Sequence, residues 1–205
     1  MVLYNPITAA TYGIQFGNKE QNGIFKRMPL DCTNFISQCI WAGYGGTDGL
    51  SLINLEHIEQ LRQRVERNFR QTTVWFGRHY NSPYDLASGP FMQVTSLWDY
   101  VVSNQWNGPR AMGFNNYKHW TKLTEKIDQG DVLQFFNESS NRYGHSVMIV
   151  SPTHSSMEEA LQHAYVSQHT MDASKRPLLD VILTNGGLEQ AKVRLLKFQS
   201  TIFTS

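Results

Sequence analysis

Hydrophobic positions early in the chain recur with the spacing of a helix. From Asn34 onward, Phe35, Ile36, Cys39 and Ile40 fall on one side of a helical wheel, and the pattern stops at the glycine-rich stretch GYGG. The stretch therefore predicts a short helix, buried along one side, that begins close to the cysteine of DCTNFISQC.

A second amphipathic segment covers residues 54–69, NLEHIEQLRQRVERNF. It places Ile58, Leu61, Val65 and Phe69 on one face and its arginines on the other. A row of arginines opposite an apolar stripe is typical of a solvated helix face more than of a binding patch. We therefore expect a surface helix here.

Two shorter segments complete the first half. Residues 70–90 are rich in turn formers and aromatic residues, as in NSPYD and ASGP, which predicts an irregular connection. Residues 93–104, QVTSLWDYVVSN, predict another short helix with Val94, Leu97 and Val101 turned inward.

The second half of the chain has the pattern of a β-sheet. VLQFF (132–136), the polar turn 137–144 and HSVMIV (145–150) predict a hairpin. Further strands are expected at residues 163–170, 178–185 and 193–199. Helices followed by an antiparallel sheet indicate the α+β class.

Composition and charge narrow the class of protein. The 205 residues are enough for one hydrophobic core, so a single domain over 1–205 is expected. A formal net charge of +1 argues against a nucleic-acid-binding surface. The first residues, MVLYNPITAATYGIQFG, have neither a basic leader nor a long apolar run, so no signal peptide and no membrane insertion are expected.

The chain contains only two cysteines, and their spacing excludes a disulfide. Cys32 and Cys39 lie roughly 10 Å apart along the axis of one predicted helix, which is too far for the bond. The seven histidines do not combine with these cysteines at zinc-ligand spacings, so no metal site is expected.

The two cysteines differ in their predicted roles. Cys39 lies within the apolar stripe and is expected to be a packing residue. Cys32 stands at the start of the helix, where Asp31 or Thr33 can cap the first turn. Free amides and the helix dipole at that position can lower the pKa of a thiol and can stabilise an oxyanion, which makes Cys32 a candidate nucleophile.

A nucleophilic thiol needs an imidazole base and a group that orients the imidazole. His145 opens a strand directly after a glycine, where its side chain can project toward a packed helix. His169 closes the next strand and is the first choice as the orienting group. With a different strand register Gln168 takes that place, and Asp172 is a third possibility.

These motifs resemble a known family. DCTNFISQ, followed by GDVLQFF and HSVMIV, resembles the putative amidase domain family of Gram-positive cell-wall and phage lytic proteins, within the papain-like NlpC and CHAP cysteine peptidases. The likeness extends to YNPITAATYG as a first helix, to SLWDY between the two catalytic halves, and to QHTMDASKRPL as a late His-Thr segment.

The resemblance implies a papain-like fold in which the nucleophile helix packs on the antiparallel sheet. It assigns Cys32 as nucleophile, His145 as base and acid, and His169 as the third member. Tyr4, Asp31 and Trp98 are expected to lie on the substrate-binding side. The arginine-rich helix departs from the family pattern, which suggests a helical insertion at about 50–110.

The expected function is that of a bacterial cysteine hydrolase that cleaves an amide in peptidoglycan and needs no cofactor. The bond is either the one between muramic acid and the stem peptide or one within the peptide. By resemblance, the protein would act outside the cell or in the wall. Two alternatives remain: a wall-binding module without turnover, and an intracellular thiol protease or acyltransferase.

Overall fold

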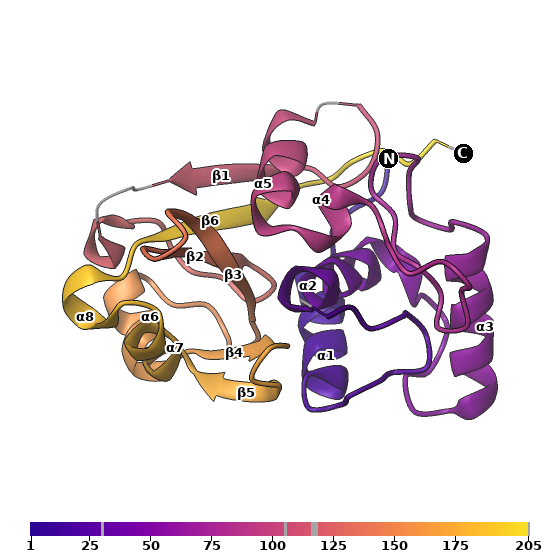
Figure 1. The fold of residues 1–205 in the computed structure, drawn as a ribbon, viewed down its shortest axis with the longest axis horizontal. Coiled ribbons are helices and arrows are strands. Elements are labelled where there is room, and N and C mark those ends of the chain that lie inside the picture. The colour runs from indigo at the N-terminus through magenta and orange to yellow at the C-terminus, as the bar shows by residue number, and fades with distance from the viewer. Residues whose placement is uncertain (30, 105, 116–118, 205) are drawn as a thin grey trace.

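The computed structural model of the chain describes residues 1–29, 31–104, 106–115 and 119–204, and is an α+β structure (Figure 1). Its helices are α1 (Pro6–Phe16), α2 (Cys32–Trp41), α3 (Leu55–Glu66), α4 (Gly89–Met92), α5 (Val94–Ser103), α6 (Met157–His163), α7 (Leu178–Thr184) and α8 (Gly187–Gln190). Its strands are β1 (Ala111–Asn115), β2 (Val132–Asn137), β3 (Arg142–Ile149), β4 (Tyr165–Gln168), β5 (Ala173–Pro177) and β6 (Val193–Phe198).

The six strands form one antiparallel sheet in the order β1-β6-β2-β3-β4-β5. The predicted hairpin is confirmed as β2 and β3, with a register shift between Phe135 and Phe136. The strand expected at 193–199 is β6, which pairs with both β1 and β2. β3 begins at Arg142, three residues before the predicted start, because the turn residues continue the pairing.

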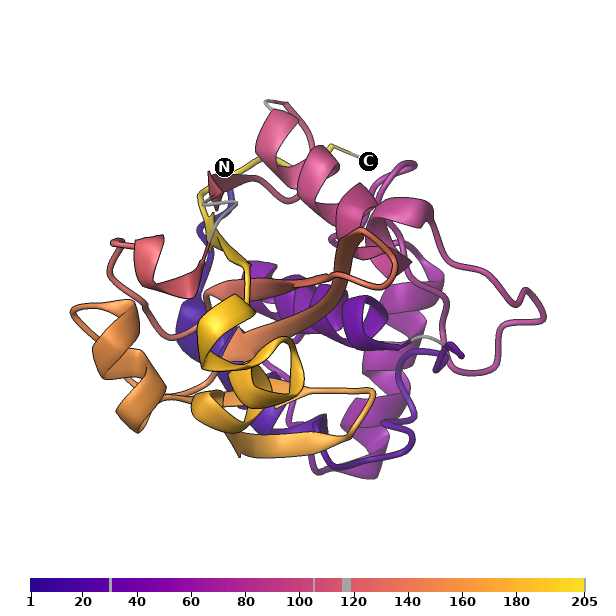
Figure 2. The ribbon, with the colours of Figure 1, turned by 60° about the vertical axis from the view of Figure 1, so that its left-hand side comes forward.

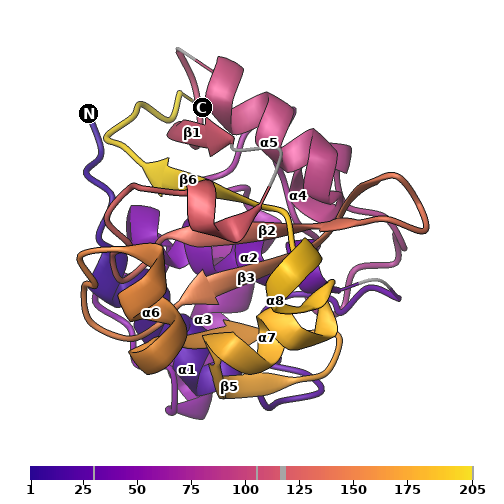
Figure 3. The same ribbon diagram turned by 90° about the vertical axis from the view of Figure 1, so that its left-hand side faces the viewer.

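Helices cover both faces of the sheet, as Figures 1 and 3 show. On one face Val132 and Met148 join the core cluster formed with α1 and α2. On the other face Leu133 and Val147 join a cluster with α6 and α7. Successive strand residues point to opposite faces, so a strand covered on both sides is apolar at nearly every position.

Helix α2 runs through the core, and all ten of its residues are buried. It continues into a π-helical turn, Ala42–Gly46, that ends the element. Gly45 adopts a φ of 87°, which an L-residue seldom tolerates, so a glycine suits this turn. The predicted helix is therefore confirmed, but it is enclosed on every side and not on one side only.

The predicted surface helix corresponds to α3, which ends at Glu66. Leu61 and Val65 are buried as expected, and Ile58 is half-buried. Phe69 lies beyond the helix end and is 40% exposed, so its expected place in the apolar stripe is wrong. The helix predicted at 93–104 is confirmed as α5, with Val94, Leu97 and Val101 buried.

The connection from α3 to α4 is irregular, as predicted, and Figure 2 shows it projecting from the body as a long loop.

None of the helices within the described residues is long and apolar enough to cross a membrane.

The strand expected at 178–185 is wrong, because these residues form α7. Leu178, Val181 and Ile182 are buried, and this spacing is that of a helix face and not of a strand. The strand expected at 163–170 is limited to β4, because α6 occupies the residues before it. Ser156 caps α6 by accepting a hydrogen bond from the amide of Glu159.

Candidate active site

Cys32 is the first residue of α2 and lies against the edge of β3. Its Sγ is 4.0 Å from the carbonyl oxygen of Gly144 and 3.8 Å from Oγ1 of Thr33. These contacts place the thiol beside the backbone that flanks His145. Pairing of β3 with β4 begins only at Met148, so this part of β3 is a free edge that the thiol can approach.

Cys32 and His145 line the same pocket, which has a volume of about 450 Å³. One wall comes from the loop before α2, a second from the start of α5 and a third from β3. The lining includes Met28, Gln93, Val94, Tyr143 and Thr170. Cys32 is 7% exposed, so its sulfur lies at the floor of a cleft that opens to solvent.

His145 is half-buried and is held by Gln168, whose Oε1 lies 3.2 Å from Nε2 of the imidazole. The amide nitrogen of Gln168 donates to the carbonyl oxygens of Thr170 and Met171, at 3.3 and 2.9 Å. Those two bonds set the amide orientation, so its oxygen faces the ring. An oxygen only accepts, so Nε2 carries the proton and Nδ1 is the basic nitrogen.

Burial raises the pKa of the Cys32 thiol above its ordinary value. Backbone amides of Ser146 and Thr33, together with the Thr33 hydroxyl, act in the opposite direction, and the nearby Asp31 carboxylate raises the pKa further. The expectation that the helix start favours a thiolate is therefore wrong for the unliganded cleft. Loss of hydration at the floor of the pocket outweighs the favourable amides.

Burial also lowers the pKa of His145, and the hydrogen bond to Gln168 partly offsets this effect. Arg176, a nearby cation, lowers it further. A neutral imidazole thus shares the pocket with a neutral thiol at neutral pH. Such a pair can react if the imidazole removes the thiol proton during attack, which is general-base catalysis.

Asp31 is the N-cap residue of α2, but its side chain makes no capping bond to the helix amides. Its Oδ1 accepts from the amide of Met28 at 2.8 Å and from the side chain of Asn34 at 2.7 Å. Its Oδ2 contacts His169. Asp31 is 2% exposed and is not part of the cleft lining, and its expected place on the substrate-binding side stays a prediction.

His169 also lies outside the cleft. Its ring stacks on Phe35 at a centroid distance of 3.8 Å, Nδ1 contacts Asp31, and Nε2 lies 3.1 Å from the carbonyl oxygen of Phe16. The expected contact of His169 with His145 is therefore replaced by that of Gln168. Gln168 is the last residue of β4 and His169 follows it, and their side chains make contacts in different places, so only Gln168 meets His145.

Asp172, the third possible orienting group, is occupied elsewhere. Its carboxylate forms a two-pronged ion pair with Arg27, at 2.8 and 3.0 Å. The pair holds the loop after β4 against the loop before α2, and it leaves the position beside His145 to Gln168.

A buried chain of polar groups runs beneath the thiol, and sequence reasoning missed it. Thr33 Oγ1 is 3.3 Å from Ser146 Oγ, which is 3.3 Å from the amide nitrogen of Gln134. The Gln134 oxygen accepts from Nε of Arg194 at 2.7 Å. All four side chains are buried. The only signal in the sequence was polar residues at core positions of otherwise apolar strands.

Trp98 supports this chain from the side and is not part of the cleft lining, and its role in substrate binding stays a prediction. The Arg194 guanidinium lies 4.2 Å from the centroid of Trp98 and 3.9 Å from that of Tyr143. The two rings enclose the buried cation, an arrangement that cation–π attraction stabilises. Of the two rings, Tyr143 lines the cleft.

Tyr4 packs far along the other end of α2. Its hydroxyl donates to the carbonyl oxygen of Gly130 at 3.0 Å, and its ring packs against Tyr44 and Phe198. Tyr4 is not part of the cleft lining, and its role beside the thiolate or the oxyanion stays a prediction. It fills the junction between α2 and the sheet.

Cys39 is completely buried in the core cluster, where burial raises its thiol pKa well above the ordinary value. Both cysteines are free thiols. Within the described residues, no group of three or more His, Cys, Asp or Glu side chains could hold a metal ion.

Comparisons with known proteins agree with the motifs at the cleft. The chain is 24% identical over 165 residues to the uncharacterized protein YhbB of Bacillus subtilis (strain 168), a match that covers 80% of the chain. The same match covers 43% of YhbB, so the chain spans less than half the length of that relative. No solved structure gave a significant match. Residues 3–195 match the family described as "Putative amidase domain", and the chain therefore belongs to this amidase family.

Proposed function

We propose that the protein is a cysteine-dependent amidohydrolase with a papain-like arrangement of nucleophile helix and sheet. One observation carries the proposal: Cys32, at the start of α2, and His145, on β3, line one pocket, and Gln168 holds the imidazole in a single tautomer. A thiol, a base and an orienting amide are the groups that acyl transfer requires.

In the first step, Nδ1 of His145 removes the proton from Cys32 as the sulfur attacks the amide carbonyl. The backbone amide of Cys32 is an orphan donor of the first helical turn and can bind the oxyanion. The imidazolium then protonates the leaving nitrogen, the C–N bond breaks, and an acyl thioester on Cys32 remains.

In the second step, the neutral imidazole removes a proton from water, which attacks the thioester. Collapse of the tetrahedral intermediate releases the acid and returns the thiol. Gln168 stays hydrogen-bonded to Nε2 throughout. An imidazolium forms in each of the two steps, and each time its Nε2–H group donates to the side-chain oxygen of Gln168. The reaction therefore uses only groups of this chain and water.

The proposed substrate class is peptidoglycan, with the cleaved bond either between muramic acid and the stem peptide or within that peptide. Support comes from the resemblance of DCTNFISQ and HSVMIV to wall-lytic enzymes and from membership of an amidase family. The cleft is open to solvent, so a polymeric substrate can enter it from the side. Action in the wall or outside the cell is part of the same proposal.

The test uses purified Gram-positive cell walls with the wild type, Cys32→Ser and Cys39→Ser. We expect turbidity loss and released amino groups from the wild type and from Cys39→Ser, and neither from Cys32→Ser. Mass spectrometry of the fragments then identifies the bond. If all three proteins bind the walls and none cleaves them, the chain is a wall-binding module and the enzymatic proposal fails.

A further inference from the structure

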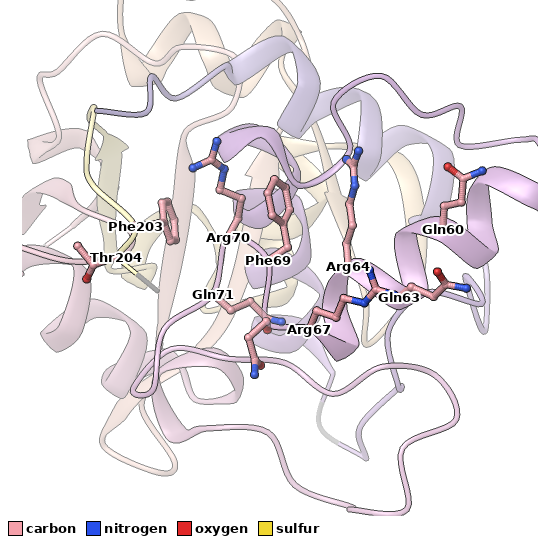
Figure 4. A pocket seen from close by; sticks show the side chains of 10 residues that line it. Gln60, Gln63, Arg64, Arg67, Phe69, Arg70, Gln71, Phe203 and Thr204 are labelled. Carbon is pink, nitrogen blue, oxygen red and sulfur yellow. The ribbon is translucent and has the colours of Figure 1, made fainter.

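A second pocket, of about 540 Å³, lies between the end of α3 and the C-terminal segment (Figure 4). Three arginines, Arg64, Arg67 and Arg70, line it together with the rings of Phe69 and Phe203. Among the described residues, no aspartate or glutamate belongs to its lining, and none of them lines both this pocket and the cleft of Cys32. We call it the arginine pocket.

Two of the three guanidinium groups are held in place by the protein. Nη1 of Arg64 donates to the carbonyl oxygens of Gly46 and Asp48, at 2.9 and 3.0 Å. Arg64 and Arg70 lie 5.2 and 5.1 Å from the ring centroid of Phe69, and Figure 4 shows that ring between them. Arg70 also lies 5.9 Å from the ring of Phe203. Fixed donors of this kind lose little entropy when a ligand binds.

In the part of the chain that the structure describes, the charges in the arginine pocket have no carboxylate partners. Within the described residues, no salt bridge involves Arg64, Arg67 or Arg70, whereas Arg62 on the same helix pairs with Glu59 at 2.7 Å. Nε of Arg70 is buried and has no hydrogen-bond partner among the described residues. Gathering like charges around one space is unfavourable until an anion enters, and a buried unpaired donor is costly as well.

The backbone next to the pocket is also unusual. Asn68 and Arg70 both have a φ of 56°, in the left-handed region that non-glycine residues rarely adopt. This conformation turns the chain directly after α3 and sets Phe69 and Arg70 at the pocket wall. Residues in such conformations concentrate at ligand sites, which agrees with the unpaired charges.

We propose that the arginine pocket binds an anion of the phosphate class, as a phosphate monoester or a phosphodiester. Three arginines that line one pocket suit a tetrahedral anion, whose several oxygens can accept from more than one arginine, better than a carboxylate with two oxygens. The net charge of +1 does not favour an extended nucleic-acid-binding surface, and neither does the confinement of these three arginines to one pocket. The inference does not depend on the proposed hydrolysis.

The test is isothermal titration of the full chain with inorganic phosphate and, separately, with poly(glycerol phosphate). The pocket variant combines Arg64→Gln, Arg67→Gln and Arg70→Gln. The matched control removes the same charge elsewhere, through Lys19→Gln, Lys126→Gln and Lys175→Gln, which are all exposed. We expect the pocket variant to lose affinity about tenfold or more and the control to stay within about twofold.

The single variant Arg67→Gln is a second test that does not risk misfolding, because Arg67 is exposed. It should weaken phosphate binding about threefold and make the salt dependence of the affinity shallower. Equal affinity per phosphate for both probes assigns a free phosphate as the ligand, and tighter binding of the polymer assigns a phosphodiester chain. The proposal is overturned if neither probe binds, if the control loses as much as the pocket variant, or if polyglutamate binds as tightly as phosphate.

Discussion

The first turn of α2 and its middle turn carry the same residue type in opposite surroundings. Cys32 in the first turn meets a solvent-filled cleft on one side and hydroxyl and amide groups on the other. Cys39 in the middle turn is enclosed within the apolar core. Burial raises the thiol pKa at both positions; at Cys32 the amides of Ser146 and Thr33 and the Thr33 hydroxyl oppose the rise, whereas at Cys39 only a backbone bond of its own residue does.

This contrast shows that position on a helix does not make a cysteine reactive. The helix start contributes free amides, but the imidazole comes from β3 and the amide that orients it from β4, both more than a hundred residues further along the chain. The proposed reactivity of Cys32 therefore depends on the contact between α2 and the sheet. Variants that alter this contact test that view, and the middle turn and other sites away from the cleft serve as references.

The largest expected difference is in alkylation of the two thiols. In the native protein, iodoacetamide should modify Cys32 at least about 10³-fold faster than Cys39, because the buried thiol reacts only when the core opens. Peptide mapping by mass spectrometry measures both rates in one sample. Similar rates at the two positions would show that the cleft does not distinguish Cys32.

Gln168→Ala should lower kcat about 100-fold while leaving the fold intact. The substitution removes the acceptor that keeps His145 in one tautomer and orientation. Turnover and urea unfolding are measured on the same preparation. An unchanged kcat would mean that another group orients the imidazole. Gln162→Ala, at an exposed position of α6, is the matched control.

His169→Ala, unlike Gln168→Ala, should reduce stability and not turnover, with a loss of about 3 kcal/mol in the free energy of unfolding. The change removes the ring stacked on Phe35 and leaves Asp31 buried with one partner fewer. Urea denaturation measures the loss, and His163→Ala, at an exposed position, should change it little. A large loss of kcat in fully folded His169→Ala protein would show that His169 takes part in catalysis.

The pH dependence of kcat/KM reports on His145. The base must be unprotonated, and burial holds its pKa below the ordinary histidine value, so activity should persist into mildly acidic solution and fall only through that lowered pKa. The hydrogen bond to Gln168 raises this pKa, so the acid limb of Gln168→Ala should move to lower pH. Movement to higher pH would contradict the assignment of the limb to His145.

The smallest effect is expected for Thr33→Val, which keeps the shape of the side chain and removes the hydroxyl beside the sulfur. Loss of a net stabilisation of about 1 kcal/mol should raise the Cys32 pKa and slow its alkylation about fivefold at neutral pH. Thr47→Val, at a buried position beyond the far end of α2, should leave the rate unchanged. An equal decrease in both variants would point to a general loss of packing.

Local patterns predicted much of the fold. The apolar stripes placed α2, α3 and α5, and the polar turn between two apolar runs placed the β2–β3 hairpin. The error at α7 has a physical cause: LLDVILTN is rich in branched apolar residues that suit a strand, yet its buried positions follow helical spacing once the segment packs on the sheet. Propensity and periodicity disagreed there, and packing favoured the helix.

The sequence by itself determined which residues are chemically able to act. It contains one cysteine at a helix start, a histidine at the edge of a strand, and the motifs that indicate an amidase family. Those features depend on spacing along the chain, which can be read directly.

Only the tertiary structure decided which groups meet. Gln168 and His169 are neighbours in the sequence, yet one contacts His145 in the cleft and the other contacts Asp31 in the core. The raised pKa of Cys32 likewise comes from burial beneath distant elements. Strand register and desolvation depend on contacts between segments far apart in the chain, and no local pattern encodes them.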